Sequence, residues 1–131
     1  MNRHSRSKSG FTLMELLLVL LLVAMLASLV APVVTGGIQR AREATLKTDL
    51  YALRKALDDY NADTGAYPAE LEELVKKRYL RRIPPDPVTE KRDTWVLVRS
   101  EDDKAGKNSG ILDIRSGSSE RASDGSYFKD W

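Results

Sequence analysis

An uninterrupted apolar run near the start of the chain constrains it more than any other feature. Residues 16–34 carry no formal charge, and Leu, Val, Ala and Met dominate them. As a helix, this run is long enough to cross the ~30 Å hydrocarbon layer of a membrane. It predicts one membrane-spanning helix and leaves roughly 95 residues after it, enough for one small domain.

The formal charge of +2 arises before the apolar run. Arg3, Arg6 and Lys8 precede it with no acidic residue among them, and removing these three from the 21 basic residues leaves 18 against 19 acidic ones. The basic excess therefore predicts membrane orientation, with residues 1–10 in the cytoplasm and the rest exported. It does not indicate a nucleic-acid partner, because the chain after residue 10 has no basic excess.

The residue types that most catalytic mechanisms need are missing from the exported part. The chain has no cysteine, and its only histidine, His4, precedes the apolar run. These absences exclude disulfides, Ser–His–Asp and Cys–His catalysis, and the usual His and Cys zinc sites from that part. We therefore expect no enzymatic activity. The rival candidates are carboxylates in segments predicted to be exposed loops, namely Asp86 with Asp93 and Glu101 with Asp102 and Asp103.

Conventional signal-peptide cleavage is not expected. A signal peptidase needs small residues one and three positions before its cut. The best candidate sites end at Ala27 and Ala31, but the matching upstream positions hold Met25 and Leu29. A plain uncleaved signal anchor stays open as an alternative.

After Pro32 the pattern becomes amphipathic. One apolar stripe with helical spacing is formed by Leu46, Leu50, Leu53, Leu57 and Tyr60. Together with the apolar run, it predicts a single helix over residues 11–61. Pro32 removes a backbone hydrogen bond, and Gly36 and Gly37 weaken the same region, so we expect a flexible joint there.

The remainder predicts a small domain. Residues 69–80 place Leu71, Leu74, Val75 and Leu80 on one side of a short helix, and residues 83–87 must run as an extended surface loop. Residues 93–100 and 110–115 are typical of strands, separated by a polar hairpin loop. The final segment ends in aromatic residues expected to pack against the sheet: Tyr127, Phe128 and Trp131. The order is long helix, short helix and small antiparallel sheet, an α+β fold.

The sharpest motif stands at the start of the apolar run. A basic segment ends in Gly10, Phe11 follows, and Glu15 comes four residues later. This joint spacing resembles the type IV prepilin leader. The resemblance implies that a prepilin peptidase cuts between Gly10 and Phe11 and methylates the new amine of Phe11. It divides the chain into a cleaved cytoplasmic leader (1–10), a transmembrane and filament-core half-helix (11–35) and a periplasmic domain (36–131).

Glu15 is the only charge in this part of the helix. A lone carboxylate there costs roughly 2.5–3.5 kcal/mol on insertion scales, so it needs a partner. The resemblance supplies one, because the new amine of Phe11 on an incoming subunit pairs with Glu15 of a neighbour. We assign filament assembly to Phe11, Glu15 and Pro32. The alternative is that Glu15 pairs within its own chain or reaches the lipid headgroups.

Beyond the leader, the sequence resembles the major pseudopilins of type II secretion systems. The resemblance rests on the long helix, on Tyr60 with Tyr67 and Pro68, on residues 83–87 and on Trp131. It implies a type IV pilin-like fold and a single-pass inner-membrane subunit of a Gram-negative-type bacterium, with its domain in the periplasm. The implied partners are further copies, minor pseudopilins, prepilin peptidase, an inner-membrane platform with a cytoplasmic ATPase, and an outer-membrane secretin.

Two other functions stay open. One is a type IV pilin of a surface fibre for adhesion, motility or DNA uptake, although many such pilins close their last loop with a disulfide that this chain cannot form. The other is a signal-anchored periplasmic binding domain, which would leave the spacing from Gly10 to Glu15 unexplained.

Calcium is the one cofactor that the resemblance implies, since major pseudopilins often hold it in their last loop. Asp113, Asp124 and Asp130 are the acids available for a weak site. Where carboxylates are expected, the chain instead has Ser119, Ser126 and Tyr127. We therefore favour a loop without metal, held by serines, Arg121 and backbone turns.

Overall fold

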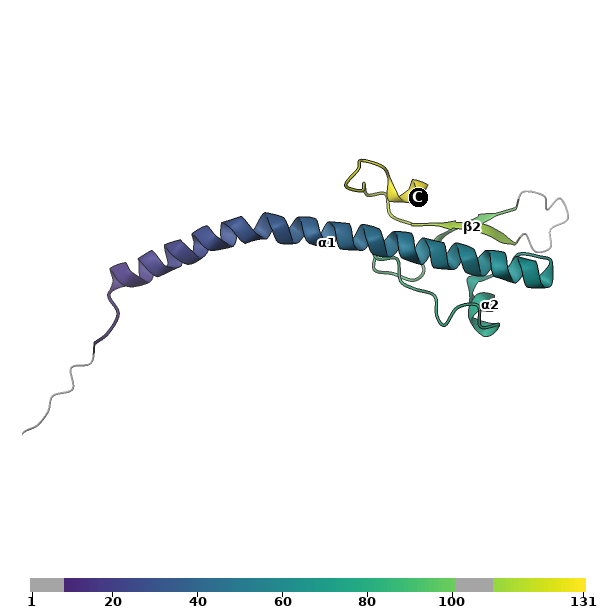
Figure 1. The fold of residues 1–131 in the computed structure, drawn as a ribbon, viewed down its shortest axis with the longest axis horizontal. Coiled ribbons are helices and arrows are strands. Elements are labelled where there is room, and N and C mark those ends of the chain that lie inside the picture. Colours follow the sequence, from purple (N-terminus) through teal and green to yellow (C-terminus); the bar gives the residue numbers. More distant parts are fainter. Residues whose placement is uncertain (1–8, 101–109) are drawn as a thin grey trace, which may run out of the picture. The chain divides into compact units, whose positions relative to one another are not determined.

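The computed structural model describes residues 9–100 and 110–131 (Figure 1). Its elements are α1 (Leu13–Thr64), α2 (Leu71–Lys76), β1 (Val96–Arg99), β2 (Ile111–Arg115) and a short 3-10 turn, η1 (Phe128–Asp130). The chain forms two compact units, Met1–Gly37 and Ile38–Trp131. This layout confirms the predicted α+β, pilin-like fold.

Helix α1 is continuous over 52 residues. It ends at Gly65, whose positive φ of 79° suits a residue without Cβ, and whose N–H donates to the Asn61 carbonyl (2.8 Å). The prediction of a helix over 11–61 is confirmed, and the helix runs unbroken through Pro32 and both glycines. A flexible joint at this point stays a prediction. Proline removes one bond of the ladder, and the bonds on either side keep the helix intact.

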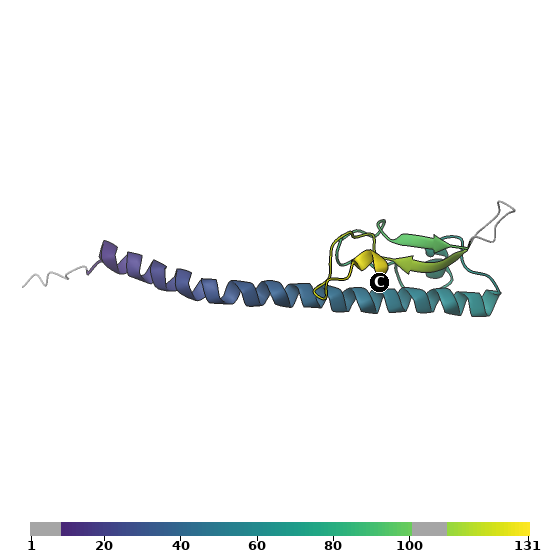
Figure 2. The same cartoon turned by 90° about the horizontal axis from the view of Figure 1, so that it is seen from above.

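The second unit is built on the apolar stripe of α1. Leu46, Leu53 and Leu57 are completely buried, as the helical spacing predicts. Figure 2 shows the sheet and the final segment lying alongside this half of α1. Each buried leucine contributes roughly 1.5–3 kcal/mol to folding. The core residues outside α1 come from α2, the residue before β1, β2 and the final segment: Leu71, Leu74, Trp95, Ile111, Ile114, Ala122 and Phe128.

The sheet has two antiparallel strands, β1 and β2, shorter than the predicted ones. Its inner face is formed by Ile111 and Ile114, while Leu112 is exposed. Gly117 follows β2 so closely that a Cβ there would lie 1.9 Å from the Thr94 carbonyl oxygen, and only glycine fits. The predicted hairpin loop lies in residues 101–109, outside the described residues, and so do Glu101, Asp102 and Asp103.

Helix α2 is shorter than the predicted 69–80. It ends at Lys76, and Arg78 adopts a positive φ of 65° that turns the chain back. The turn places the Tyr79 ring edge-on against Tyr60, with ring centroids 5.5 Å apart. The Tyr79 hydroxyl donates to Asp63 (2.6 Å), which raises the pKa of Tyr79 to about 12. An aromatic contact with α1 therefore replaces the last helical turn.

The segment over residues 83–87 is extended, as predicted, but Asp86 is not exposed. Its side chain is completely buried. One carboxylate oxygen accepts from the Val88 N–H (2.9 Å) and the other from the Ser116 hydroxyl (2.5 Å). Because both oxygens are occupied by internal donors, Asp86 connects this segment to the end of β2. The rival hypothesis that it pairs with the exposed Asp93 as a catalytic carboxylate is wrong.

We expect Asp86→Ala to lower the free energy of unfolding by roughly 2–4 kcal/mol, because it leaves buried donors without an acceptor. Asp93→Ala, which removes an exposed carboxylate from the same region, is the control and should change it by less than about 0.5 kcal/mol. Chemical denaturation of the two variants measures the difference. Equal stability of both would mean that the Asp86 contacts contribute nothing.

Candidate functional site

The first turn of α1 contains one of the predicted site residues, Glu15. Thr12 precedes the helix, and its hydroxyl accepts the backbone N–H of Glu15 (3.1 Å). Thr12 is therefore the N-cap, and Glu15 is the third helical residue, where a carboxylate is favoured by the helix dipole. Sequence reasoning missed this local role, although the Thr-x-x-Glu spacing of a capping box was there to show it.

Gly10, Phe11 and Glu15 lie together. With Ser9, they line a small hollow of ≈ 240 Å³ at the start of the first unit. The third predicted assembly residue, Pro32, is not part of this group, because it follows Glu15 by almost five helical turns, or roughly 25 Å. Gly10 and Phe11, predicted for cleavage, thus lie beside Glu15, predicted for charge pairing.

Nothing in the described chain requires glycine at position 10. A Cβ added to Gly10 would meet no atom within 4 Å. Its neighbour Phe11 is 87% exposed. A need for a small residue at position 10 must therefore come from another molecule that grips the backbone there, as a peptidase groove does.

The surface that follows is apolar and uncovered. Among the described residues, α1 is the one helix long and apolar enough to cross a membrane, and no part of its apolar window is buried. The exposed side chains include Leu16, Leu20, Val23 and Leu26, each at least half exposed. An exposed apolar surface of this extent is a site for lipid or for other protein chains.

The three acids considered for calcium are not brought together. Asp113 accepts the Arg54 Nε–H (2.7 Å), and Asp124 accepts both the N–H and the hydroxyl of Ser126 (2.9 and 2.6 Å). Asp130 is exposed in η1. Within residues 9–100 and 110–131, no group of three or more His, Cys, Asp or Glu side chains is placed to hold a metal ion.

The expected staple of the final segment is present and has an additional anchor on α1. Arg121 donates to the Tyr127 hydroxyl (2.7 Å), as the staple hypothesis requires. The Glu43 carboxylate accepts the N–H of Ser123 with one oxygen (2.6 Å) and the Ser123 hydroxyl with the other (2.7 Å). Sequence reasoning missed Glu43, because its contact joins residues 80 positions apart and no local pattern marks it.

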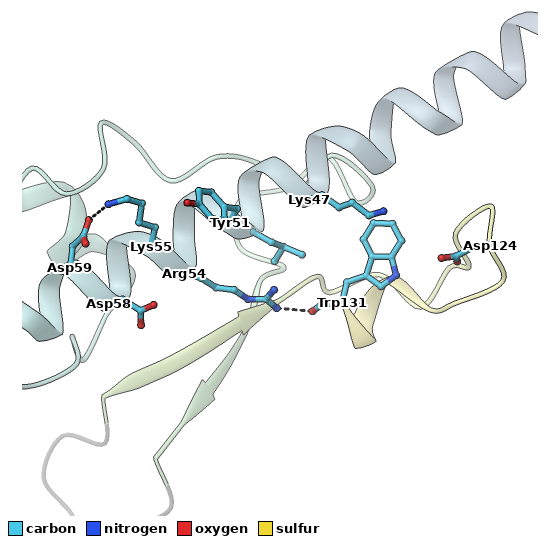
Figure 3. A pocket seen from close by; sticks show the side chains of 9 residues that line it. Lys47, Tyr51, Arg54, Lys55, Asp58, Asp59, Asp124 and Trp131 are labelled. Carbon is cyan, nitrogen blue, oxygen red and sulfur yellow. Dashed lines mark hydrogen bonds and ion pairs between the residues drawn. The ribbon is translucent and has the colours of Figure 1, made fainter.

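An open groove of ≈ 700 Å³ lies between α1 and the final segment (Figure 3). Arg54 crosses its floor and donates to Asp113, to the Ile114 carbonyl (3.0 Å) and to the Trp131 main-chain oxygen (2.7 Å). Lys55 in the same groove is paired with Asp59 (2.6 Å). Arg54 therefore cross-links α1 with β2 and the end of the chain, whereas Lys55 and Asp59 pair within α1.

Comparison with known proteins identifies the family. The family described as "Prokaryotic N-terminal methylation motif" matches residues 5–31, which include Gly10, Phe11 and Glu15. The Pseudomonas aeruginosa protein named "Type II secretion system core protein G" is 38% identical, with 63% of this chain and 69% of that protein covered. The chain belongs to the type II secretion system core protein G family.

Other core protein G relatives agree with this assignment. The Escherichia coli K12 protein is 35% identical over 65% of this chain and 70% of its own length. The Vibrio cholerae protein is 36% identical over 63% of this chain and 66% of its own length. The chain thus spans about two thirds of the length of these relatives. No solved structure matches it.

The carboxylates of the final segment predict acid sensitivity. The Ser123 hydroxyl lowers the pKa of Glu43 below its usual 4.5, and the Ser126 hydroxyl lowers the pKa of Asp124 below its usual 3.8. A folded-state pKa below the unfolded value stabilises the fold above the unfolded pKa and loses this effect as pH falls through the folded pKa. The melting temperature should therefore fall between about pH 5 and about pH 3.

Glu43→Gln should flatten that part of the stability curve, measured by tryptophan fluorescence during heating at each pH. The control is Glu120→Gln, which removes an exposed carboxylate from the same segment. A Glu43→Gln curve as steep as that of the unmodified chain would contradict the assignment of acid sensitivity to Glu43.

Proposed function

We propose that this chain is a structural subunit of a pseudopilus that drives protein export through a type II secretion system. Membership of the core protein G family supports the system. The role as a filament subunit is supported by the uncovered apolar surface of α1, which begins next to Phe11 and Glu15. It gives the chain a surface suited first to a membrane and then to packing against other copies.

Charge pairing sets the register of the filament in this proposal. A cut between Gly10 and Phe11 creates an ammonium group one helical turn from Glu15. In the described residues, the Glu15 carboxylate accepts no hydrogen bond from a side chain of its own chain, because Thr12 contacts its backbone N–H instead. The carboxylate is therefore available to the amine of another subunit, and pairing neutralises both charges where unpaired charge is costly.

The proposed location and partners follow from the system. Residues 1–10 lie in the cytoplasm until a prepilin peptidase removes them, residues 11–35 lie in the inner membrane, and residues 36–131 lie in the periplasm. Further copies and minor pseudopilins form the filament. An inner-membrane platform with a cytoplasmic ATPase extends it, and the filament moves exported proteins through an outer-membrane secretin. In this arrangement the chain is a mechanical element without catalysis of its own.

Processing is the first test. The mature protein purified from its host membranes should have an intact mass reduced by residues 1–10 and increased by one methyl group. Gly10→Val should leave the precursor uncleaved, since the peptidase loses close access to the backbone. Gly36→Val is the control, because a Cβ at either glycine meets no atom within 4 Å. Normal cleavage of Gly10→Val would remove the leader interpretation.

Assembly is the second test, and Glu15→Gln is the informative variant. Glutamine can replace glutamate in a capping box, so the helix start is kept while the charge is lost. We expect normal membrane insertion but a loss of filament and of secretion of roughly tenfold or more. Secretion assays and crosslinking of neighbouring subunits measure the effect.

Glu15→Ala removes both the charge and the polar side chain, so comparing it with Glu15→Gln separates the effect of the charge from an effect on the helix start. If Glu15→Gln assembled normally and only Glu15→Ala failed, Glu15 would act through the helix start, and charge pairing would be wrong.

Electron microscopy of cells at native expression tests whether the filament is a pseudopilus, since long surface fibres would indicate a pilus instead.

A further inference from the structure

The final segment, residues 116–131, is the place where the family resemblance implies a calcium ion. Calcium takes six to eight oxygen ligands, carboxylates among them. In this chain, three of the four carboxylate oxygens of Glu43 and Asp124 are already used as acceptors. Both oxygens of Glu43 accept from Ser123, and one oxygen of Asp124 accepts twice from Ser126. The residues present therefore do not fit a calcium ion.

Cationic side chains also surround the segment. The Lys47 ammonium lies 4.7 Å from the centre of the Trp131 ring, and the Arg121 guanidinium lies 4.7 Å from the centre of the Tyr127 ring. Lys47 also helps to lower the pKa of Asp124. A divalent cation placed among these groups would be repelled by like charges. Lys47 and Arg121 thus disfavour a divalent ion beside these two rings.

Hydrogen bonds provide the closure that a metal would otherwise provide. We call Glu43, Ser123, Asp124, Ser126 and Trp131 the clasp. The Ser126 hydroxyl donates to Asp124 (2.6 Å) and accepts the indole N–H of Trp131 (2.7 Å). The Glu43 carboxylate receives two donors and joins the segment to α1. Charged acceptors make these hydrogen bonds stronger than neutral ones.

We propose that the clasp holds the segment over residues 116–131 closed on α1 without a calcium ion. The proposal concerns the folding of the domain and is independent of filament assembly. It assigns to Glu43, which lies on α1 far from the segment in sequence, the role of the anchoring acceptor.

The test uses the full chain purified in detergent, with its two tryptophans as fluorescent probes of unfolding. Melting curves are recorded with the chelator EGTA and with millimolar CaCl2. We expect the two melting temperatures to agree within about 1 °C. A saturable rise of the melting temperature with CaCl2 would overturn the proposal, because a ligand that binds only the folded state stabilises it in proportion to its occupancy.

Variants test the clasp itself. Ser123→Ala and Glu43→Gln should each lower the melting temperature by roughly 4–8 °C in EGTA and in CaCl2 alike. Asp130→Asn is the control, because Asp130 was considered as a calcium ligand and its exposed side chain takes no part in the clasp. It should melt with the unmodified chain in both buffers.

Two further results would overturn the proposal. One is a lower melting temperature of Asp130→Asn in CaCl2 only, which would indicate a calcium ligand. The other is an unchanged melting temperature of both clasp variants. If a clasp variant failed to fold, the CaCl2 titration of the unmodified chain would still decide between a metal and the clasp.

Discussion

The structure depends on a single helix, α1, which must stay helical both where its apolar side chains are uncovered and where one face is buried by the rest of the chain. Every residue of a helix interior satisfies its own backbone hydrogen bonds, so α1 needs no water and no sheet to do this. In the first unit the chain supplies no cover for its side chains. In the second unit one face is buried under the chain's own strands and turns. The main role of the strands and turns in the fold is therefore to bury the apolar stripe of α1.

Such a cover is small, and polar cross-links stabilise it. A two-stranded sheet is at best marginally stable by itself, and this chain has no cysteine with which to staple it. Arg54 and Glu43, both on α1, supply the cross-links instead. Arg54 binds β2 and the main chain of Trp131, and Glu43 binds Ser123. These polar contacts thus add to the stability that the apolar stripe of α1 gives to the packing of the sheet and the final segment.

The parts of the fold that follow from local periodicity could be predicted from sequence. The stripe from Leu46 to Tyr60 has the helical period, and each of its members is buried as expected. The N-terminal methylation motif could also be predicted, because its spacing is short and unusual. Helix α2 was predicted too long, since the turn at Arg78 is set by an aromatic contact with α1 and not by a local break signal.

Long-range polar contacts could not be predicted in the same way. Asp86 stands among prolines, which predict an exposed loop, yet it is buried because the Ser116 hydroxyl and the Gly117 N–H meet it from the end of β2. Glu43 is one of many charges on an amphipathic helix, and only the folded position of Ser123 gives it a role. Pro32 lies inside a continuous helix, because the helix propagates on both sides of the one backbone hydrogen bond that proline removes.

The proposed cut lies before the start of α1, so it leaves the helix and its cap complete. Helix α1 begins at Leu13 and is capped by Thr12, and both residues follow the bond between Gly10 and Phe11. Cleavage there removes no residue of the helix and no part of its cap. It adds one positive charge within a helical turn of Glu15, where the described chain offers that carboxylate no side-chain donor. The proposed processing would therefore change the charge at the end of α1 and leave its fold unchanged, so that the proposed pairing between subunits would need no refolding.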